Sequence, residues 1–295
     1  MKVLNFGSLN YDYVYNVDHA VTPGETLSSS GMETFLGGKG LNQSISLARA
    51  GVPVFHAGMI GEEGAQFLET CKKSGVDTTY IRRIPGKSGH TIIQLDKNAQ
   101  NCILLYGGSN RKITRAFVDE VLSGFAKGDI LLLQNEINEL DYIIDKAYEI
   151  GMRIALNPSP FDSALDACDL KKISIFLLNE IEGGQISGET EPEKILDVTM
   201  EKFPDSAVVL TLGSDGVMYR DKDQTCRQGI FPVKAVDTTA AGDTFTGYFI
   251  ASLLAEMPVA EALRMCARAS SITVSRMGAT DSIPTMDEVR AALEG

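Results

Sequence analysis

The sequence predicts an α/β protein with a doubly wound, mostly parallel sheet flanked by helices on both faces. Strand and helix patterns alternate along the chain, which is the order that βαβ units produce. Four short runs are apolar throughout, as strands buried on both faces are. The strand runs are residues 130–133, 154–156, 175–178 and 208–212, and the helical patterns are residues 113–123, 139–150, 193–202 and 259–275. With 295 residues, 44% of them hydrophobic, the chain can bury a large core, and we expect residues 1–295 to form a single domain.

Two stretches depart from this alternation. The chain begins with an apolar strand at residues 3–6, but residues of about 11–36 and 88–108 show shorter, alternating patterns with polar turns such as Asp96-Lys-Asn98. Half-buried antiparallel strands have this pattern. No repeat, low-complexity tract or long linker separates these two insertions from the rest, so we expect them to belong to the same domain.

Composition excludes several classes of function. The net charge is -12 with a pI near 4.8, and no long basic run is present, so the nucleic-acid backbone is not an expected partner. No apolar run approaches the roughly 20 residues of a membrane helix, and the first residues lack a signal-peptide pattern. Five widely spaced cysteines indicate reduced thiols. These features predict a cytoplasmic protein without a membrane or nucleic-acid partner.

A glycine-rich turn precedes the first predicted helix. Leu36-Gly-Gly-Lys-Gly-Leu-Asn42 opens a helix with an apolar side at Leu41 and Ile45, and Gly51 ends it. Backbone that a polar ligand approaches closely has such glycines. Leu41 stands where a Walker P-loop would carry Ser or Thr, so this is not that motif. A tight strand-to-helix connection is the alternative explanation.

A second turn of small residues, Asp237-Thr-Thr-Ala-Ala-Gly-Asp243, opens another helical pattern, in which apolar residues recur from Phe245 to Met257. The first N–H groups of a helix lack partners and lie at the positive end of its dipole, so they form an anion site. Asp243 places a carboxylate beside that site. This suits a hydroxyl that loses its proton while a phosphoryl group is transferred. Helix capping by Asp237 or Asp243 is the alternative.

The two motifs, in this order, resemble the two signatures of the ribokinase-like, or PfkB, carbohydrate kinases. The resemblance extends over nearly the whole chain. Further matching segments are residues 5–10, 22–26, 155–158, 179–182, 211–216 and 276–279. The resemblance implies a ribokinase-like fold and ATP-dependent transfer of the γ-phosphate to the primary hydroxyl of a pentose, with D-ribose favoured. It also implies Mg²⁺ and K⁺ as cofactors. The two insertions would form one small β-sheet subdomain, a lid over the sugar, and a homodimer would be made through that lid.

The same resemblance assigns roles to individual residues. Asp243 is the catalytic base, and the backbone amides of Ala240, Ala241, Gly242 and Asp243 hold the γ-phosphate. The sugar-binding residues are Asn10, Asp12, Gly38, Lys39, Asn42, Glu136 and Asp243. For Asn10 and Asp12 the alternative is an Asx turn, and for Glu136 it is a solvated loop acid.

Nucleotide and cation contacts are expected from the C-terminal half. The resemblance implies nucleotide binding by Asn179, Thr211, Gly213, Gly216, Ala241 and Gly242. Glu182 would order Mg²⁺ through water, which suits a cation that keeps much of its hydration. Asn179 could instead simply cap a helix. The positions that match the family's potassium site are Asp237, Thr239, Thr273, Arg276, Gly278 and Ser282.

Other substrates and one other class of function stay open. Fructokinase, deoxyribokinase and nucleoside kinase activity are alternatives within the family, and tyrosines 11, 13 and 15 could stack on a base. His90 alone is a weak clamp for a second phosphate at neutral pH, so we expect an unphosphorylated sugar. A non-catalytic sugar-binding regulator on the same fold is the alternative class. The presence of Asp243 beside the anion turn argues against it, because a sensor needs no base.

Overall fold

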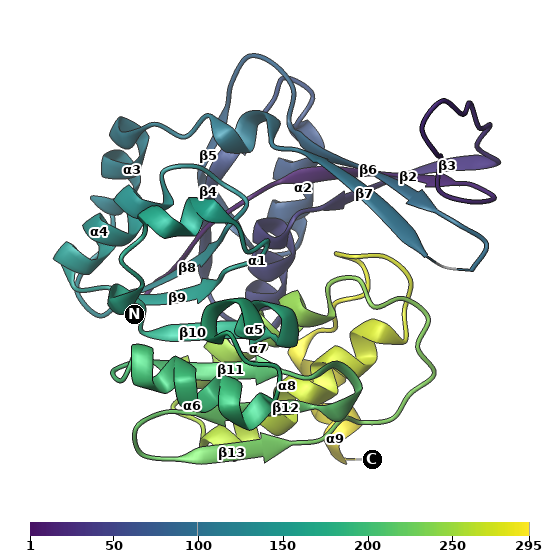
Figure 1. Cartoon of the computed structure of the whole chain (residues 1–295). Coiled ribbons are helices and arrows are strands. Elements are labelled where there is room, and N and C mark those ends of the chain that lie inside the picture. Colours follow the sequence, from purple (N-terminus) through teal and green to yellow (C-terminus); the bar gives the residue numbers. More distant parts are fainter. Residues whose placement is uncertain (99, 295) are drawn as a thin grey trace.

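A nine-stranded sheet forms the centre of the molecule (Figure 1). The computed structural model describes residues 1–98 and 100–294. Seven strands are parallel, and β12 and β13 add an antiparallel edge, so the expected mostly parallel sheet is confirmed. The order across the sheet is β13 (Thr225–Gln228), β12 (Val217–Arg220), β11 (Ala207–Thr211), β10 (Ile175–Asn179), β9 (Arg153–Asn157), β8 (Ile130–Gln134), β1 (Val3–Phe6), β4 (Val54–Ile60) and β5 (Asp77–Arg83).

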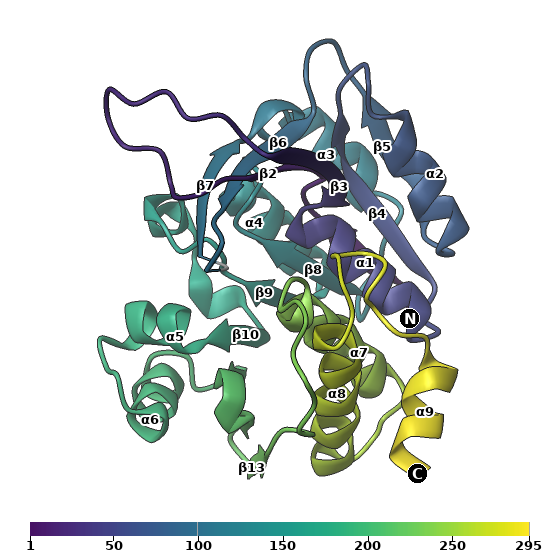
Figure 2. The same cartoon turned by 90° about the vertical axis from the view of Figure 1, so that its right-hand side faces the viewer.

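Helices cover both faces of this sheet, and Figure 2 shows α5 and α6 on one side of the strands with α7, α8 and α9 on the other. The first core lies under α1 (Lys39–Arg49), α2 (Ala65–Lys73), α7 (Ala241–Leu254), α8 (Val259–Val274) and α9 (Met286–Glu294). The second lies under α3 (Arg115–Leu122), α4 (Leu140–Ile150), α5 (Glu180–Ser187) and α6 (Pro192–Lys202). Successive strand residues enter opposite cores, as Ile130 and Leu131 do, which explains the unbroken apolar runs.

Short 3-10 turns connect several elements, at Gly108–Arg111, Ser163–Ala167, Leu170–Lys172 and Gly213–Asp215. The expected helices are present with small shifts at their ends. The helix after the second motif ends at Leu254, so Met257 lies beyond it. Gly51 adopts a φ of 85° just after α1, as expected of a glycine that ends a helix. None of the helices in the described part of the chain has both the length and the apolar character that crossing a membrane requires.

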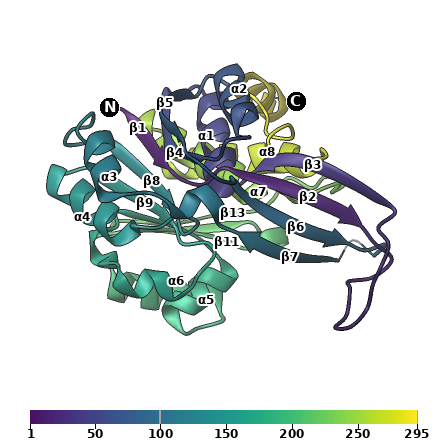
Figure 3. The ribbon, with the colours of Figure 1, turned by 90° about the horizontal axis from the view of Figure 1, so that it is seen from above.

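The two insertions form a separate sheet, which Figure 3 shows extending away from the main body. Its order is β3 (Gly31–Gly37), β2 (Asn10–Asn16), β6 (Gly89–Leu95) and β7 (Asn101–Tyr106). Each insertion is an antiparallel pair, as expected, but β2 and β6 join the two insertions in parallel. The expectation of half-buried strands is wrong for β7, because all of its residues are exposed.

Close packing of α1 on α7 brings the two sequence motifs together. A Cβ on Gly247 would lie 2.2 Å from Ser46 Oγ, so only glycine allows this approach. Ser46 Oγ also donates a hydrogen bond to the carbonyl of Thr244 at 2.9 Å. Both helices begin at the edge where the parallel strands end, which is where ligands bind in open α/β sheets.

Candidate active site

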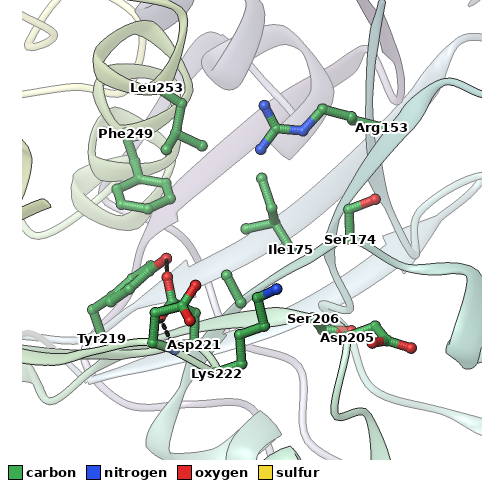
Figure 4. Close-up of a pocket in the computed structure, with 12 residues that line it drawn as sticks. Arg153, Ser174, Ile175, Asp205, Ser206, Tyr219, Asp221, Lys222, Phe249 and Leu253 are labelled. Atoms are coloured by element: carbon green, nitrogen blue, oxygen red, sulfur yellow. Dashed lines mark hydrogen bonds between the residues drawn. The ribbon is translucent and has the colours of Figure 1, made fainter. Parts of the chain in front are cut away.

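Two cavities lie at opposite ends of the sheet. The smaller, of about 270 Å³, is lined by Arg153, Ser174 and Ala207 at the amino ends of β9, β10 and β11 (Figure 4). None of the residues predicted for the site lines it. The larger, of about 440 Å³, lies at the carboxyl edge and contains Lys39, Glu182 and the turn from Ala240 to Asp243. The carboxyl-edge cavity is therefore the candidate active site.

Asp243 lies in the first turn of α7 and is 8% exposed. Asn42 Nδ2 donates to its Oδ2 at 2.9 Å, and Gln43 Nε2 donates to its Oδ1 at 2.9 Å. Among the described residues, no cation lies within ion-pair distance of this carboxylate. Two neutral amides thus orient a carboxylate that borders the cavity and can accept a proton there.

The turn before α7 presents free backbone donors. Ala240 has a φ of 61°, a left-handed conformation that costs a residue with a side chain about 1 kcal/mol or more. The amides of Gly242 and Asp243 have no hydrogen-bond acceptor within the described ranges. A Cβ on Gly242 would meet nothing within 4 Å, so this glycine leaves space in the cavity. The turn therefore places free backbone donors, which suit an anion, beside the Asp243 carboxylate.

The predicted sugar residues Asn10 and Asp12 lie at the start of β2, next to the glycine-rich turn. Asn110 Nδ2 donates to Asn10 Oδ1 at 2.7 Å, and Thr91 Oγ1 donates to Asp12 Oδ1 at 2.5 Å. Gly37 makes room for Asp12, because a Cβ there would lie 1.9 Å from Asp12 Oδ2. Burial raises the pKa of Asp12 to about 6, with smaller contributions from Glu136 and Asp243, while the Thr91 hydrogen bond lowers it. Asn10 and Asp12 are held by side chains of other elements, which an Asx turn would not require.

Glu136 is not the solvated loop acid of the alternative explanation. Its Oε2 accepts hydrogen bonds from Ser8 Oγ and, at 3.0 Å, from the backbone N–H of Lys39. Burial raises its pKa, while the charge of Lys39 and these hydrogen bonds lower it. Burial also acts to lower the pKa of Lys39, but Asp243, Glu136 and Glu182 outweigh it, and the net shift is upward. Lys39 therefore stays charged between the acids of the site.

Gly38 begins α1 with a φ of 92°, which favours glycine, and a Cβ there would lie 3.0 Å from the backbone nitrogen of Asn10. The glycine-rich turn thus agrees with both explanations of its glycines, a tight strand-to-helix connection and a backbone close to the site. It makes a tight connection, and it brings Gly38 and Lys39 against the start of β2.

On the nucleotide side, Asn179 and Glu182 form a capping box at the start of α5. Asn179 Oδ1 accepts from the Glu182 amide at 2.9 Å, and Glu182 Oε2 accepts from the Asn179 amide at 3.0 Å. Asn179 therefore caps α5, as the alternative explanation predicted. Thr211 and Gly213 also line the cavity, whereas Gly216 does not; a Cβ on Gly216 would lie 2.1 Å from the carbonyl of Gln228.

Magnesium has few direct ligands in this site. Within residues 1–98 and 100–294, no three His, Cys, Asp or Glu side chains are grouped as metal ligands. Glu182, 4% exposed, and Asp243 are nevertheless both part of the cavity wall. This set fits a cation that keeps several waters and takes its other ligands from phosphate oxygens.

The residues predicted for a potassium site come from the loop before α7, the last turn of α8 and the loop that follows α8. Asp237 Oδ1 accepts from the Thr239 amide at 2.9 Å, and its Oδ2 accepts from the Gly278 amide at 3.0 Å. Thr273 is buried and its hydroxyl hydrogen-bonds that of Thr244 at 3.0 Å. Ser282 is buried, while Arg276 pairs with Glu288. The loops lie together, but the side chains of Thr273 and Arg276 are already engaged.

Sequence reasoning missed several residues of the site. Gln43 contacts Asp243 directly, Asn157 accepts from Gln43 Nε2 at 3.2 Å, and Thr91 and Asn110 hold the predicted sugar residues. One available signal was a polar residue at the end of a buried apolar strand, as Asn157 is. Such a residue requires a hydrogen-bond partner in the core.

The fold and this site define a phosphotransferase with an alcohol acceptor. The pattern of the pfkB family carbohydrate kinases matches residues 1–286 of the chain. A ribokinase of Haemophilus influenzae is 34% identical over 298 residues, covering 98% of this chain and 97% of that protein. A ribokinase of Staphylococcus aureus is 35% identical over 301 residues, covering 98% of each.

Solved structures agree with these sequence relationships. The structure of Arabidopsis thaliana ribokinase complexed with ribose and ATP has a TM-score of 0.88 at 28% identity, covering 100% of this chain and 99% of that one. A ribokinase from Thermotoga maritima has a TM-score of 0.87 at 31% identity and covers 100% of both chains. The chain belongs to the pfkB family of carbohydrate kinases.

Proposed function

We propose that this protein transfers the γ-phosphate of ATP to the primary hydroxyl of D-ribose, giving ribose 5-phosphate. The observation that carries the proposal is the position of Asp243, whose carboxylate is oriented by two amides beside the free N–H groups of Gly242 and Asp243. Transfer of a phosphoryl group needs positioned reactants, charge neutralisation and a proton acceptor. Asp243 takes the hydroxyl proton, and the turn from Ala240 to Asp243 holds the transferred group.

The choice of ribose has separate support. Apolar contact cannot hold a polyol, which needs several hydrogen-bond partners. Amide, carboxylate and ammonium groups for this purpose come from Asn10, Asp12, Gly38, Lys39, Asn42 and Glu136. The curated relatives at 31–35% identity include several ribokinases, whereas a deoxyribokinase of Salmonella typhi is 25% identical. Tyr11 is buried against Phe67 with its hydroxyl on the Glu63 carbonyl, so it is not free to stack on a base. This removes one of the three tyrosines that a nucleoside base could have used.

Cations complete the proposed chemistry. Mg²⁺, ordered through water by Glu182, would supply positive charge to the phosphates. Nucleotide contacts come from Asn179, Thr211 and Gly213. The linked loops at Asp237 and Gly278 would hold K⁺ next to the anion turn, where it can order the turn without touching substrate. Replacing potassium by sodium in the rate assay tests this assignment, and equal rates would remove it.

The second sheet would act as a lid over the sugar and as the dimer interface. Its strand β2 carries Asn10 and Asp12, so it contributes directly to the proposed sugar site. Its edge strand β7 exposes apolar side chains on both faces, Ile103 and Leu105 on one and Leu104 and Tyr106 on the other, and a partner subunit would cover the face that carries Leu104.

A coupled assay of ADP release tests the proposed activity. The panel is ribose, deoxyribose, fructose, fructose phosphate and adenosine, each at saturating ATP and Mg²⁺. We expect the highest kcat/KM with ribose. A higher value with another acceptor would reassign the substrate, and binding of sugar without any turnover would favour the regulator.

A further inference from the structure

A chain of buried side-chain amides leads from Asp243 into the core beneath α1. Gln43 Nε2 donates to Asp243 Oδ1 at 2.9 Å, and Gln134 Nε2 donates to Gln43 Oε1 at 2.6 Å. Gln134 Nε2 also donates to Asn5 Oδ1 at 2.9 Å. Asn5, Gln43 and Gln134 are all 0% exposed. Polar groups at such depth cost stability unless they are hydrogen-bonded, so their presence requires a reason.

The donors of this chain fix its direction. A side-chain amide has two hydrogens on nitrogen, and Gln134 uses both, toward Gln43 Oε1 and Asn5 Oδ1. Gln43 must therefore turn its oxygen toward Gln134 and its NH₂ group toward Asp243 and Asn157. If the Gln43 amide were reversed, its oxygen would face the Asp243 carboxylate. Its NH₂ group would then face the NH₂ group of Gln134, so two donors would meet.

The far end of the chain is anchored to α1. Asn5 Nδ2 donates to the carbonyl of Gly40 at 2.7 Å and to Ser44 Oγ at 2.8 Å. Ser44 Oγ lies 2.8 Å from His56 Nδ1, and burial lowers the pKa of His56 to about 4, so the ring is neutral. No charged group therefore contacts the series of buried amides at this end.

Gln134 occupies its position at a cost. Its Oε1 is buried and has no hydrogen-bond partner within the described residues. An unsatisfied buried carbonyl destabilises the folded protein. An apolar side chain of similar size would remove this carbonyl but would leave Gln43 Oε1 and Asn5 Oδ1 without their donor. The two donors of Gln134 are the property that such a side chain would lack.

We propose that Gln43 and Gln134 are positioning residues that hold the Asp243 carboxylate in the orientation for accepting the substrate proton. The inference rests on the proposed function of Asp243 as base. Gln43 fixes one carboxylate oxygen while Asn42 fixes the other. Gln134 does not touch Asp243; it acts by keeping the Gln43 amide from turning over. Asn157, which accepts from Gln43, also donates to Glu182 Oε2 at 3.4 Å, so the same amide joins the base to the magnesium side.

The test compares Gln134→Met, Gln43→Met and the double variant, because methionine has a similar volume and no donor. We expect Gln134→Met to lower kcat by about 10- to 100-fold, with KM for sugar and ATP within about two-fold of wild type. The double variant should be no slower than Gln43→Met alone, because Gln134 acts through Gln43. Gln134→Met should be less stable than wild type, because Gln43 Oε1 and Asn5 Oδ1 lose their donor, so kcat is compared at a temperature where a thermal melt shows every variant to be folded.

Asn135→Leu is the matched control. This neighbouring buried amide donates to the Pro160 carbonyl at 2.6 Å and to Asp162 Oδ1 at 2.8 Å, outside the chain of amides. Its kcat should stay at the wild-type value. If Gln134→Met fails to fold, Gln134→Asn serves instead, since it keeps a neutral amide but is one methylene shorter and cannot hold the Gln43 oxygen at hydrogen-bond distance, and it should lower kcat in the same way.

Wild-type kcat in Gln134→Met, or a loss in the double variant equal to the product of the single losses, would overturn the inference. Asp243→Asn separates the two proposals. If that variant is inactive while Gln134→Met is fully active, only the positioning role fails. If Asp243→Asn is fully active, the base assignment itself fails.

Discussion

Asn42 Nδ2 donates a hydrogen bond to Asp243 Oδ2 at 2.9 Å, joining residues 201 positions apart in the sequence. One belongs to the glycine-rich turn that begins α1, and the other to the small-residue turn that begins α7. Close packing at Gly247 and Ser46 makes this contact possible. The two motifs therefore form one site, in which the residues that begin α1 orient the Asp243 carboxylate of α7.

Gly242→Val tests the anion turn. A Cβ at Gly242 meets no neighbour and its φ is not positive, so the variant should unfold at the wild-type temperature. The added side chain enters the cavity beside the free N–H groups, and kcat/KM for ATP should fall by roughly 10²-fold or more. Initial rates and a thermal melt measure the two effects.

Gly229→Val is the control for that substitution, since its Cβ also meets nothing but lies outside the cavity. It should alter neither rate nor stability. Unchanged ATP kinetics in Gly242→Val would remove the turn from phosphate binding.

Asp12→Asn should raise stability and lower sugar affinity. The pKa of Asp12 is about 6 in the folded protein against 3.8 for an unperturbed aspartate, so the folded state holds the proton more tightly. Stability of the wild type therefore falls as pH rises from about 4 to 6 and stays lower above that. At pH 8 the variant should gain up to roughly 3 kcal/mol, and the gain should vanish near pH 3.

Denaturant unfolding at pH 8 and pH 3, with KM for ribose at pH 8, checks this prediction. KM should rise at least about ten-fold, because a carboxylate that accepts sugar hydroxyls is lost. Glu33→Gln, an exposed acid on β3, should change neither quantity. A pH-independent stability difference, or an unchanged KM, would contradict the account of Asp12.

The sequence predicted the layers of the fold well but not the edges of the sheets. A run that is apolar throughout, such as Ile130 to Leu133, predicts a strand buried on both faces, and in the structure its residues alternate between the two cores. By contrast, the parallel pairing of β2 with β6 joins residues 79 positions apart, such as Asn10 and Gly89, which local patterns do not encode. The sequence also did not predict that β7 is fully exposed. An alternation of apolar and polar residues predicts a buried strand face only where another element packs on that face.

The candidate site divides in the same way. Asp243 and the glycines of the two turns belong to short contiguous motifs whose residue types indicate a chemical role. They could therefore be predicted from the sequence. Gln43 and Gln134 could not, since a glutamine near a helix start or a strand end is unremarkable until the fold places it against Asp243. Resemblance assigned Glu136 to the sugar site, and its buried hydrogen bonds to Ser8 and Lys39 removed the solvated alternative.

Glu182→Gln should raise the Mg²⁺ requirement without unfolding α5. Glutamine at this position can still accept from the Asn179 amide, so the capping box survives and stability should change by less than about 1 kcal/mol. The Mg²⁺ concentration for half-maximal rate should rise about ten-fold, because a charge that orders the hydrated cation is lost. A titration of rate against Mg²⁺ measures this, and a curve identical to wild type would rule out the role.

Leu104→Lys tests the dimer through the second sheet. Leu104 is 66% exposed on β7, and a charge there would have to be desolvated in the interface. Light scattering after size exclusion should show a dimer for wild type and a monomer for the variant. Tyr148→Lys, at a 55% exposed apolar residue of α4, should leave the dimer intact. A wild type that is already monomeric would refute the interface.

The most direct measurement is the turnover of Asp243→Asn at saturating ribose and ATP, combined with equilibrium binding of both. Asparagine keeps the shape of the side chain but cannot accept the proton. We expect kcat to fall by about 10³-fold or more while both dissociation constants stay within a few-fold of wild type. Turnover equal to that of wild type would contradict the assignment of Asp243 as the base, and with it the proposed mechanism.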